Sequence, residues 1–166
     1  MKLIPWKFFR TWECISCGVC CKKYIVGLSK EEALRLIKKY GKHTVILKGK
    51  RYFIRKINGT CIFQVGNLCS IQREKPLACR LWPFFISKKP LKDRDRLLAE
   101  FEYKNQVFYV YVDPFCRGLN RGKTPITKAI IEAIRIKYGE QNYQLYTTSR
   151  ILTTNLSNRG IYYVSL

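Results

Sequence analysis

The alternation of apolar and polar residues predicts an amphipathic helix soon after the first cysteines. Ser29 and Glu32 are spaced as a capping box, so a helix is expected to start there and to end at Gly41. Leu34 and Ile37 are expected on its buried face. The pattern therefore places one short amphipathic helix in the first third of the chain.

A second helix is predicted in the last third. Thr124-Pro125 is a typical helix start and Gly139 is a typical stop. Beyond it, residues 142–153 fit a helix or a strand, and residues 160–166 are expected to form a closing strand.

Runs of β-branched and aromatic residues lie between the two helices. Residues 44–47, 51–57 and 60–65 are predicted strands. Asn58-Gly59 stands between the last two, and this dipeptide is the strongest short hairpin signal in the chain.

A further hairpin is predicted from residues 97–103 and 107–113. Both faces of its second strand are apolar and are expected to be covered. One face carries Phe108, Val110 and Val112, and the other carries Val107, Tyr109 and Tyr111.

This order of elements predicts an α+β fold with antiparallel hairpins and two or three helices, because no βαβ rhythm appears. A chain of 166 residues, 47% of them hydrophobic, is long enough for one domain with a core and short for two. We expect a single domain over residues 1–166. It would hold a cysteine-cluster region at about 12–118 and a basic helical extension at about 119–166.

The charge is strongly positive. There are 32 Lys and Arg residues against 11 Asp and Glu residues, a net charge of +21. An excess of this size repels itself in a compact state unless a polyanion neutralises it, so nucleic acid or an anionic surface is the expected partner class.

No stretch of the sequence resembles a membrane span or a secretory signal. The first twelve residues lack an uninterrupted apolar run, and no window approaches the roughly 18 apolar residues that a span needs. We therefore expect a cytoplasmic protein. Its abundance of Lys, Arg, Ile and Tyr is typical of a thermophilic source.

Eight cysteines dominate the candidate chemistry. The first four form the pattern C-x2-C-x2-C-C, in which a C-x2-C turn lets two thiolates converge on one ion while backbone amides donate to sulfur. All eight are candidate metal ligands: Cys14, Cys17, Cys20, Cys21, Cys61, Cys69, Cys79 and Cys116.

Eight thiols suit zinc, as one or two ions, or one iron–sulfur cluster held by four cysteines. Four disulfides or buried free thiols are the alternatives. We favour metal because C-x2-C clustering in a cytosolic protein is typical of metal sites, with hyperthermophile disulfides as the exception. We provisionally group Cys14, Cys17 and Cys20 with Cys79, because the first cluster lacks a fourth ligand if Cys21 points away.

The cysteine segments resemble a known family. CISCGVCCKKY, starting at Cys14, and CIFQVGNLCSIQREKPLACRLWPF, starting at Cys61, resemble the YkgJ-like CxxCxxCC family of zinc- or iron-chelating domains. The resemblance covers roughly residues 12–118, and Cys116-Arg117-Gly118 matches the late cysteine of the family. It implies metal chelation at these cysteines, and some members are described as iron–sulfur oxidoreductases. It implies no particular reaction for this chain.

The residues after Cys79 are expected to protect the centre. Arg80 is expected to donate to a cysteine sulfur, while Trp82 and Phe84 shield the site from water and pack beside it. His43, the only histidine, is expected on the surface.

Basic residues cluster around the first cysteines and the predicted hairpin. Bases interleaved with aromatics suit a surface that follows phosphates and stacks bases, while a solvated thermophile surface is the alternative. The candidate nucleic-acid contacts are Lys22, Lys23, Lys48, Lys50, Arg51, Arg55 and Lys56.

Together these features favour a structural metal protein that binds RNA, within a ribosome or another ribonucleoprotein. An iron–sulfur oxidoreductase or electron carrier with an acidic protein partner is the alternative, and a metal-transfer protein is a third hypothesis. A non-enzyme is favoured, because the sequence shows no Ser/His/Asp set and no phosphate-binding glycine loop.

Overall fold

The computed structural model describes residues 2–146 of the chain. They form two lobes, each with its own apolar core. The architecture is α+β with antiparallel strands, as the sequence predicted. Five α-helices occur in the described residues, more than the two or three expected, because three of them are single turns of five residues or fewer.

The first lobe is built on a four-stranded antiparallel sheet, and we call it the β11 lobe after its longest strand. The predicted second hairpin is its centre, with Phe101 opposite Phe108. The elements of the lobe are β1 (Ile4–Pro5), η1 (Trp6–Phe8), β9 (Phe84–Ser87), η4 (Asp93–Asp95), α4 (Arg96–Ala99), β10 (Glu100–Tyr103), β11 (Gln106–Val112) and α5 (Ile126–Lys137).

Both faces of β11 are covered along most of its length. Val110 and Val112 enter the main core beneath α5, and Tyr109 and Tyr111 pack on the other face. Val107 was expected to be covered but is 43% exposed, because it lies at the end of the strand beside the hairpin turn. Residues 97–99 were expected in a strand but belong to the short helix α4.

The second lobe packs α2 against a three-stranded sheet in the order β2-β4-β3, and we call it the α2 lobe. Two small hairpins extend it toward the cysteines. Its elements are β2 (Gly27–Leu28), α2 (Lys30–Tyr40), η2 (Lys42–Thr44), β3 (Val45–Lys48), β4 (Arg51–Ile54), β5 (Lys56–Ile57), β6 (Thr60–Cys61), β7 (Gln64–Val65) and β8 (Leu68–Cys69).

Helix α2 begins and ends as predicted. The capping box of Ser29 and Glu32 is present, and Gly41 ends the helix. Leu34 was predicted on the buried face of the helix, but its side chain is 52% exposed. The helix turns Ala33 and Leu36 toward the core instead.

The Asn58-Gly59 hairpin is confirmed, and both of its turn residues have positive φ angles, as a tight hairpin turn requires. The strand predicted over 51–57 is interrupted at Arg55, where β4 ends and β5 begins. The Arg55 guanidinium Nε donates to the His43 carbonyl oxygen at 2.6 Å. The His43 side chain is exposed, as expected.

Helix α5 starts after Thr124-Pro125 and stops before Gly139, as predicted. Residues 142–146 form neither a helix nor a strand. The remainder of the ambiguous segment and the predicted closing strand lie outside the described residues. Among residues 2–146, none of the helices combines the length and the apolar character needed to cross a membrane.

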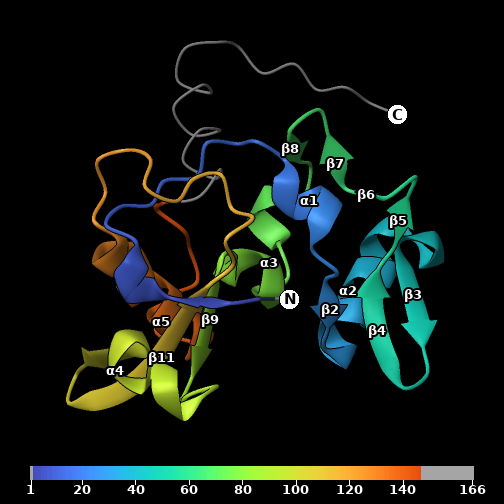
Figure 1. The fold of residues 1–166 in the computed structure, drawn as a ribbon. Coiled ribbons are helices and arrows are strands. Elements are labelled where there is room, and N and C mark those ends of the chain that lie inside the picture. The colour runs from blue at the N-terminus through green and yellow to red at the C-terminus, as the bar shows by residue number, and fades with distance from the viewer. Residues whose placement is uncertain (1, 147–166) are drawn as a thin grey trace.

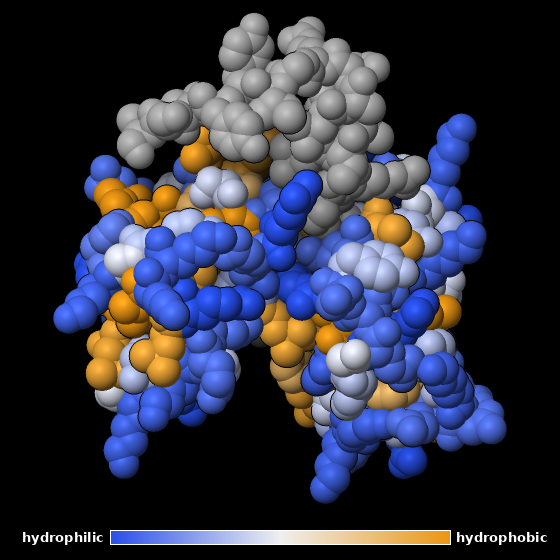
Figure 2. All heavy atoms as spheres, turned by 180° about the vertical axis from the view of Figure 1, so that it is seen from behind, coloured by the Kyte–Doolittle hydropathy of each residue, from blue (hydrophilic) through white to orange (hydrophobic). Residues whose placement is uncertain are grey.

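In Figure 1 the β11 lobe lies at the left and the α2 lobe at the right, with two single-turn helices between them. These are α1 (Val19–Lys23) and α3 (Leu77–Leu81), and α3 is preceded by η3 (Gln72–Glu74). Seen from behind in Figure 2, hydrophilic side chains cover most of both lobes, and a hollow separates them on one side. A groove of about 350 Å³ is lined by residues of β2, α3 and β9.

Candidate metal centre

All eight cysteines line one cavity of about 80 Å³ where the two lobes meet. They come from the segment before α1 and from α1 itself, from the small hairpins, from α3 and from the loop after β11. All eight lie in the described residues, and none of them is joined in a disulfide. The cavity therefore gathers the complete set of thiols that the sequence marked as candidate ligands.

Two glycines allow the cysteine segments to approach one another. Gly18 begins α1 with φ at 68°, and a Cβ atom there would stand 2.6 Å from the Gln64 side chain. Gly118 lies so close to Glu13 that a Cβ atom would meet its carbonyl oxygen at 2.1 Å. The Glu13 backbone N–H donates to the Gly118 carbonyl oxygen at 3.2 Å. This crossing of two distant segments brings Cys116 beside the first cysteines.

Cys116 lies near Cys14 and Cys17, and we call these three the three-thiol group. Burial raises the pKa of Cys116 to about 11, and the nearby Cys14 and Cys17 act in the same direction. The Trp12 indole Nε1 donates to the Cys116 sulfur at 3.2 Å and opposes this rise. A donor fixed on the sulfur favours the thiolate, which is the form that binds metal.

The other five thiols form a second set, the five-thiol group, in which Cys21 lies between Cys20 and Cys61. Hydrogen bonds with the Cys21 thiol lower the pKa of Cys20 to about 6 and that of Cys61 to about 7, while the pKa of Cys21 itself is raised. Two thiolates sharing one proton donor are a ready source of charged sulfur ligands near neutral pH.

Cys69 and Cys79 complete the five-thiol group. Burial raises the pKa of each of these two thiols above the ordinary value for cysteine. Nearby Cys61 and Cys20 raise both pKa values further, and Lys75, which also lines the cavity, lowers them. Lys75 thus supplies positive charge where thiolates would gather.

The observed neighbours of the thiols differ from the grouping of Cys14, Cys17 and Cys20 with Cys79 that was suggested from the sequence. Cys20 does lie with Cys79, but Cys14 and Cys17 lie with Cys116. Cys21 does not point away from the site, since it hydrogen-bonds with Cys61. The difference arises because the left-handed Gly18 precedes α1, and the helix turns Cys20 and Cys21 toward the small hairpins. Sequence spacing does not reveal that turn.

The residues fit a thiolate-bound metal by donor type, since clustered cysteines suit zinc and iron–sulfur centres. In the described part of the chain, no three Cys, His, Asp or Glu side chains are already arranged to hold an ion. Metal binding would therefore require the thiols to rotate toward one another within the cavity.

Aromatic rings wall the cavity. Tyr24 and Trp82 line it, and their rings pack at a tilt of 44° with centroids 4.9 Å apart. Phe84, the other expected shield, lies one layer further out, where it packs on Trp12 at 5.2 Å. Arg80 was expected to donate to sulfur, but Trp12 makes the sulfur hydrogen bond instead. The Nη2 atom of Arg80 is buried without a partner among residues 2–146.

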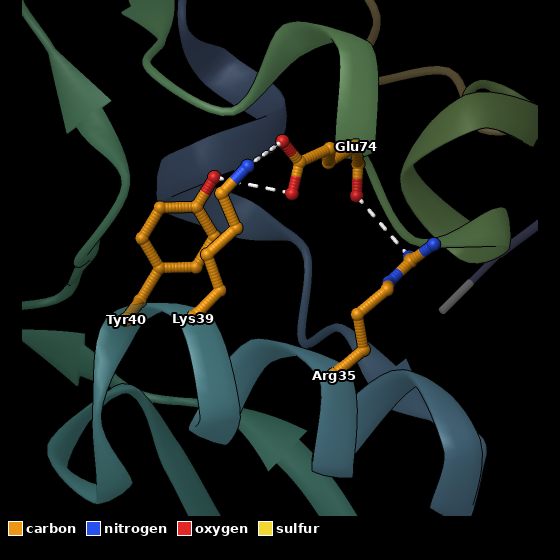
Figure 3. Close-up of polar contacts among 4 residues, drawn as sticks. All are labelled: Arg35, Lys39, Tyr40 and Glu74. Carbon is orange, nitrogen blue, oxygen red and sulfur yellow. Dashed lines mark hydrogen bonds and ion pairs between the residues drawn. The ribbon is translucent and has the colours of Figure 1, made fainter.

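Helix α2 holds the segment that carries Cys69 and Cys79, through the contacts shown in Figure 3. The Glu74 carboxylate accepts hydrogen bonds from Lys39 and, at 3.2 Å, from the Tyr40 hydroxyl. Arg35 donates to the Glu74 carbonyl oxygen at 3.4 Å. Because Glu74 lies between the two cysteines in sequence, these contacts position both ends of the loop.

A single carboxylate joins the starts of two helices. Glu32 Oε2 accepts from the Ser29 backbone N–H at 2.9 Å, within the capping box of α2. Its Oε1 accepts from the Leu77 backbone N–H at 2.7 Å, at the first residue of α3. The position of Cys79 in α3 therefore depends on a side chain of α2.

Replacing Glu32 by Gln is expected to destabilise the protein by about 1–2 kcal/mol, because an amide nitrogen then faces a backbone N–H donor. A thermal melt should show a fall of roughly 3–8 °C. Glu31→Gln, one residue earlier on the same helix turn, is the matched control for the loss of charge. Equal destabilisation by both variants would contradict the bridging role of Glu32.

The candidate nucleic-acid residues divide into two sets. Lys48, Lys50 and Arg51 are exposed at the tip of the β3–β4 hairpin. Nearer the cavity, Lys56 Nζ donates to the Lys22 carbonyl oxygen at 2.6 Å. Lys23 lies over the Phe115 ring, 5.9 Å from its centroid. Arg55, tied to His43, and Lys56 thus support the backbone as well as contributing charge.

Two features of the site were not found from the sequence. The donor to Cys116 is Trp12, a residue 104 positions earlier, and the α2 contacts to Glu74 and Leu77 join segments at least 34 positions apart. Of the residues that make these contacts, only Glu32 was marked by a local sequence pattern, the capping box. Long-range pairs of this kind leave no spacing pattern in a single sequence.

Comparison with known proteins agrees with the cysteine pattern. A family model, CxxCxxCC, described as "Putative zinc- or iron-chelating domain", matches residues 13–117. No curated protein and no solved structure gives a significant match. The matched residues span more than half of the chain and contain all eight cysteines of the cavity. This chain belongs to the CxxCxxCC family.

Proposed function

We propose that the cysteines bind metal as a structural centre that fastens the two lobes together, and that the basic surface binds RNA. The observation that carries the metal proposal is the convergence of eight thiols, contributed by separate elements, on one cavity. Membership of a family of chelating domains supports the same chemistry.

The division of the thiols supports two zinc ions. Tetrahedral zinc takes four cysteines, and the two groups hold three and five. Cys20 follows Cys17 by three residues, the spacing of a C-x2-C turn, so it is suited to complete the three-thiol group and leave four in the other. Among the described residues no sheet contains strands of both lobes. Bound metal would therefore add rigidity between them, because metal-binding free energy is added to folding free energy.

The chain's own residues would tune such a centre. Trp12 donates to sulfur, Lys75 offsets thiolate charge, and Tyr24 and Trp82 limit access of water. Neutralisation and shielding suit a stable centre better than an exchangeable one. This favours a structural role over metal transfer.

Elemental analysis and a visible spectrum of protein purified without oxygen or added metal test the proposal. We expect about two zinc ions per chain and no colour. Iron with acid-labile sulfide and a broad visible band would instead support the redox alternative, and the next step would be to seek an acidic protein partner. Protein that folds with neither metal would contradict the metal proposal.

The RNA proposal is supported by charge that the described residues do not neutralise. The three salt bridges within residues 2–146 involve Glu74, Asp95 and Glu140, none of them at the β3–β4 hairpin. Lys48, Lys50 and Arg51 are therefore available for phosphate oxygens. A ribonucleoprotein such as the ribosome is the proposed setting, since a net charge of +21 favours a large polyanion as partner.

Replacing Lys48, Lys50 and Arg51 together by Gln is expected to weaken RNA binding and to reduce the slope of log affinity against log salt by about two. The hairpin tip is preferable to Arg55 and Lys56 because the latter also support the backbone. The matched control replaces three exposed bases of the β11 lobe, Lys89, Lys92 and Arg94, by Gln. An unchanged slope in the hairpin variant would exclude this surface.

A further inference from the structure

The β2–β4–β3 sheet of the α2 lobe has a second face that belongs to none of the apolar cores of the described residues, and its apolar residues Ile46 and Phe53 are half-buried. The register pairs Val45 with Ile54, and both are buried in the core under α2. Because opposed residues in an antiparallel pair point to the same side, the alternate pairs point away from that core. They are Ile46 with Phe53 and Lys48 with Arg51.

Phe53 is an aromatic ring on this outer face. Its side chain belongs to no apolar core and makes no ring or cation–π contact within residues 2–146. On the neighbouring strand its partner is Gly27, where a Cβ atom would lie 4.0 Å from the Phe53 ring. A glycine at that position leaves one side of the ring without a neighbouring side chain. Phe53 is half-buried, and the space left by Gly27 lies beside its ring, where another planar group can approach.

Bases surround this ring on its own face. Arg51 lies two positions before Phe53 on β4, and alternate residues of a strand share a face. Arg55 follows directly after the end of β4. Lys48 stands opposite Arg51. The bond from Arg55 Nε to the His43 carbonyl oxygen, 2.6 Å long, fixes its guanidinium beside the sheet. The five residues that the register places on this face contain no acid, and neither does the adjoining Arg55: they are Gly27, Ile46, Lys48, Arg51 and Phe53.

We propose that this face is a base-stacking platform for single-stranded RNA, an inference that rests on the proposed RNA-binding function and specifies its site. An unpaired base would stack on Phe53, while Lys48, Arg51 and Arg55 contact the phosphates on either side. The basic side chains favour a polyanion as the ligand. The accessible side of the Phe53 ring favours a polyanion whose bases are unpaired and can stack. A duplex keeps its bases inside and offers no such partner.

The platform predicts a loss of affinity that does not depend on charge. Phe53→Leu is expected to weaken binding of a fluorescein-labelled single-stranded RNA of about 12 nucleotides by roughly 5- to 150-fold, the effect of removing one base stack. The salt slope should stay the same, since no phosphate contact is lost. The matched control is Phe8→Leu, which changes an aromatic residue of the β11 lobe that is 60% exposed, and it should bind as the unaltered protein does.

A second variant tests whether a folding defect, and not the loss of the ring, weakens binding by Phe53→Leu. Phe53→Trp retains a stacking ring and should bind within a fewfold of the unaltered protein, and its added indole fluorescence should be quenched when RNA binds. Melting temperature and metal content, measured for each variant, confirm that the fold is intact.

The outcomes separate the platform from the wider function. Binding of single-stranded RNA that is unaffected by Phe53→Leu would overturn the platform and leave RNA binding in place. Equal affinity for single-stranded and duplex RNA would overturn it as well. If the unaltered protein does not bind RNA at low salt, both the platform and the RNA-binding function are wrong.

Discussion

Replacing Cys61 by Ser is expected to remove the metal of the five-thiol group and to leave that of the three-thiol group in place. Cys61 is 9% exposed, and its sulfur hydrogen-bonds with Cys21 near the middle of the group. A serine hydroxyl is a poor ligand for zinc or an iron–sulfur cluster, and three remaining well-placed thiols hold an ion much more weakly than four.

The expected loss of stability is large. Structural zinc contributes about 10–16 kcal/mol of binding free energy in small zinc-binding peptides, and this energy is available only to the folded state. Loss of the ion should therefore loosen the α2 lobe, where five of the eight thiols are gathered. Elemental analysis gives the metal content, and hydrogen exchange of the β4 and β6 amides reports whether that lobe opens.

Double variants test whether there are two groups. Cys61→Ser combined with Cys79→Ser should lose no more metal than either change alone, because both residues serve the same group. Cys61→Ser combined with Cys116→Ser should lose the metal of both groups. If Cys61→Ser and Cys116→Ser each removed all of the metal, a single shared centre would be indicated and the division into two groups would be wrong.

Features with a local sequence signal were predicted well. The capping box at Ser29, the Asn58-Gly59 turn and the helix stop at Gly139 each depend on residues within a few positions. Each rests on one dominant physical effect, either a cap or a positive φ angle. For such elements a single sequence contains nearly all the information that the local structure needs.

Features that depend on packing were predicted less well. Periodicity placed Leu34 inside, but the helix turns Ala33 and Leu36 to the core, because the sheet beneath it fixes the rotation of the helix. The strand predicted from residue 97 begins as helix α4, where residues 97–99 precede the sheet. A choice between these alternatives requires the tertiary neighbours, which an isolated pattern lacks.

The candidate site shows the same division. Cysteine spacing identified all eight thiols that line the cavity, because C-x2-C clustering is a strong chemical signal. It did not identify which thiols are neighbours. That depends on the turn at Gly18 and on the crossing of Glu13 with Gly118, two close approaches between segments far apart in sequence.

Metal affinity is expected to depend more steeply on pH in acid than near pH 8, because the thiols of the five-thiol group hold their protons unequally. In the metal-free protein, hydrogen bonds with Cys21 lower the pKa of Cys20 to about 6 and that of Cys61 to about 7. Burial raises the pKa of Cys69 and Cys79. At about pH 8, Cys61 is thus a thiolate already, as is Cys20, while Cys21, Cys69 and Cys79 still carry protons.

The sign and size of the effect follow from the protons that metal displaces. With Cys20 completing the three-thiol group, the ion of the five-thiol group is held by Cys21, Cys61, Cys69 and Cys79. Binding at about pH 8 then releases about three protons, from Cys21, Cys69 and Cys79, and affinity falls about a thousandfold per pH unit as pH is lowered. Below about pH 7, Cys61 is protonated as well, so about four protons are released and the fall approaches ten-thousandfold per unit.

Competition with a chromophoric zinc chelator from about pH 5 to about pH 9 measures this slope, corrected for protonation of the chelator itself. The Cys116→Ser variant is the suitable protein, because it isolates the five-thiol group from the other one. A slope that stays at about four protons across this range would show that Cys61 is protonated near neutral pH. The hydrogen bonds with Cys21 would then not produce the thiolates that the arrangement of sulfur atoms indicates.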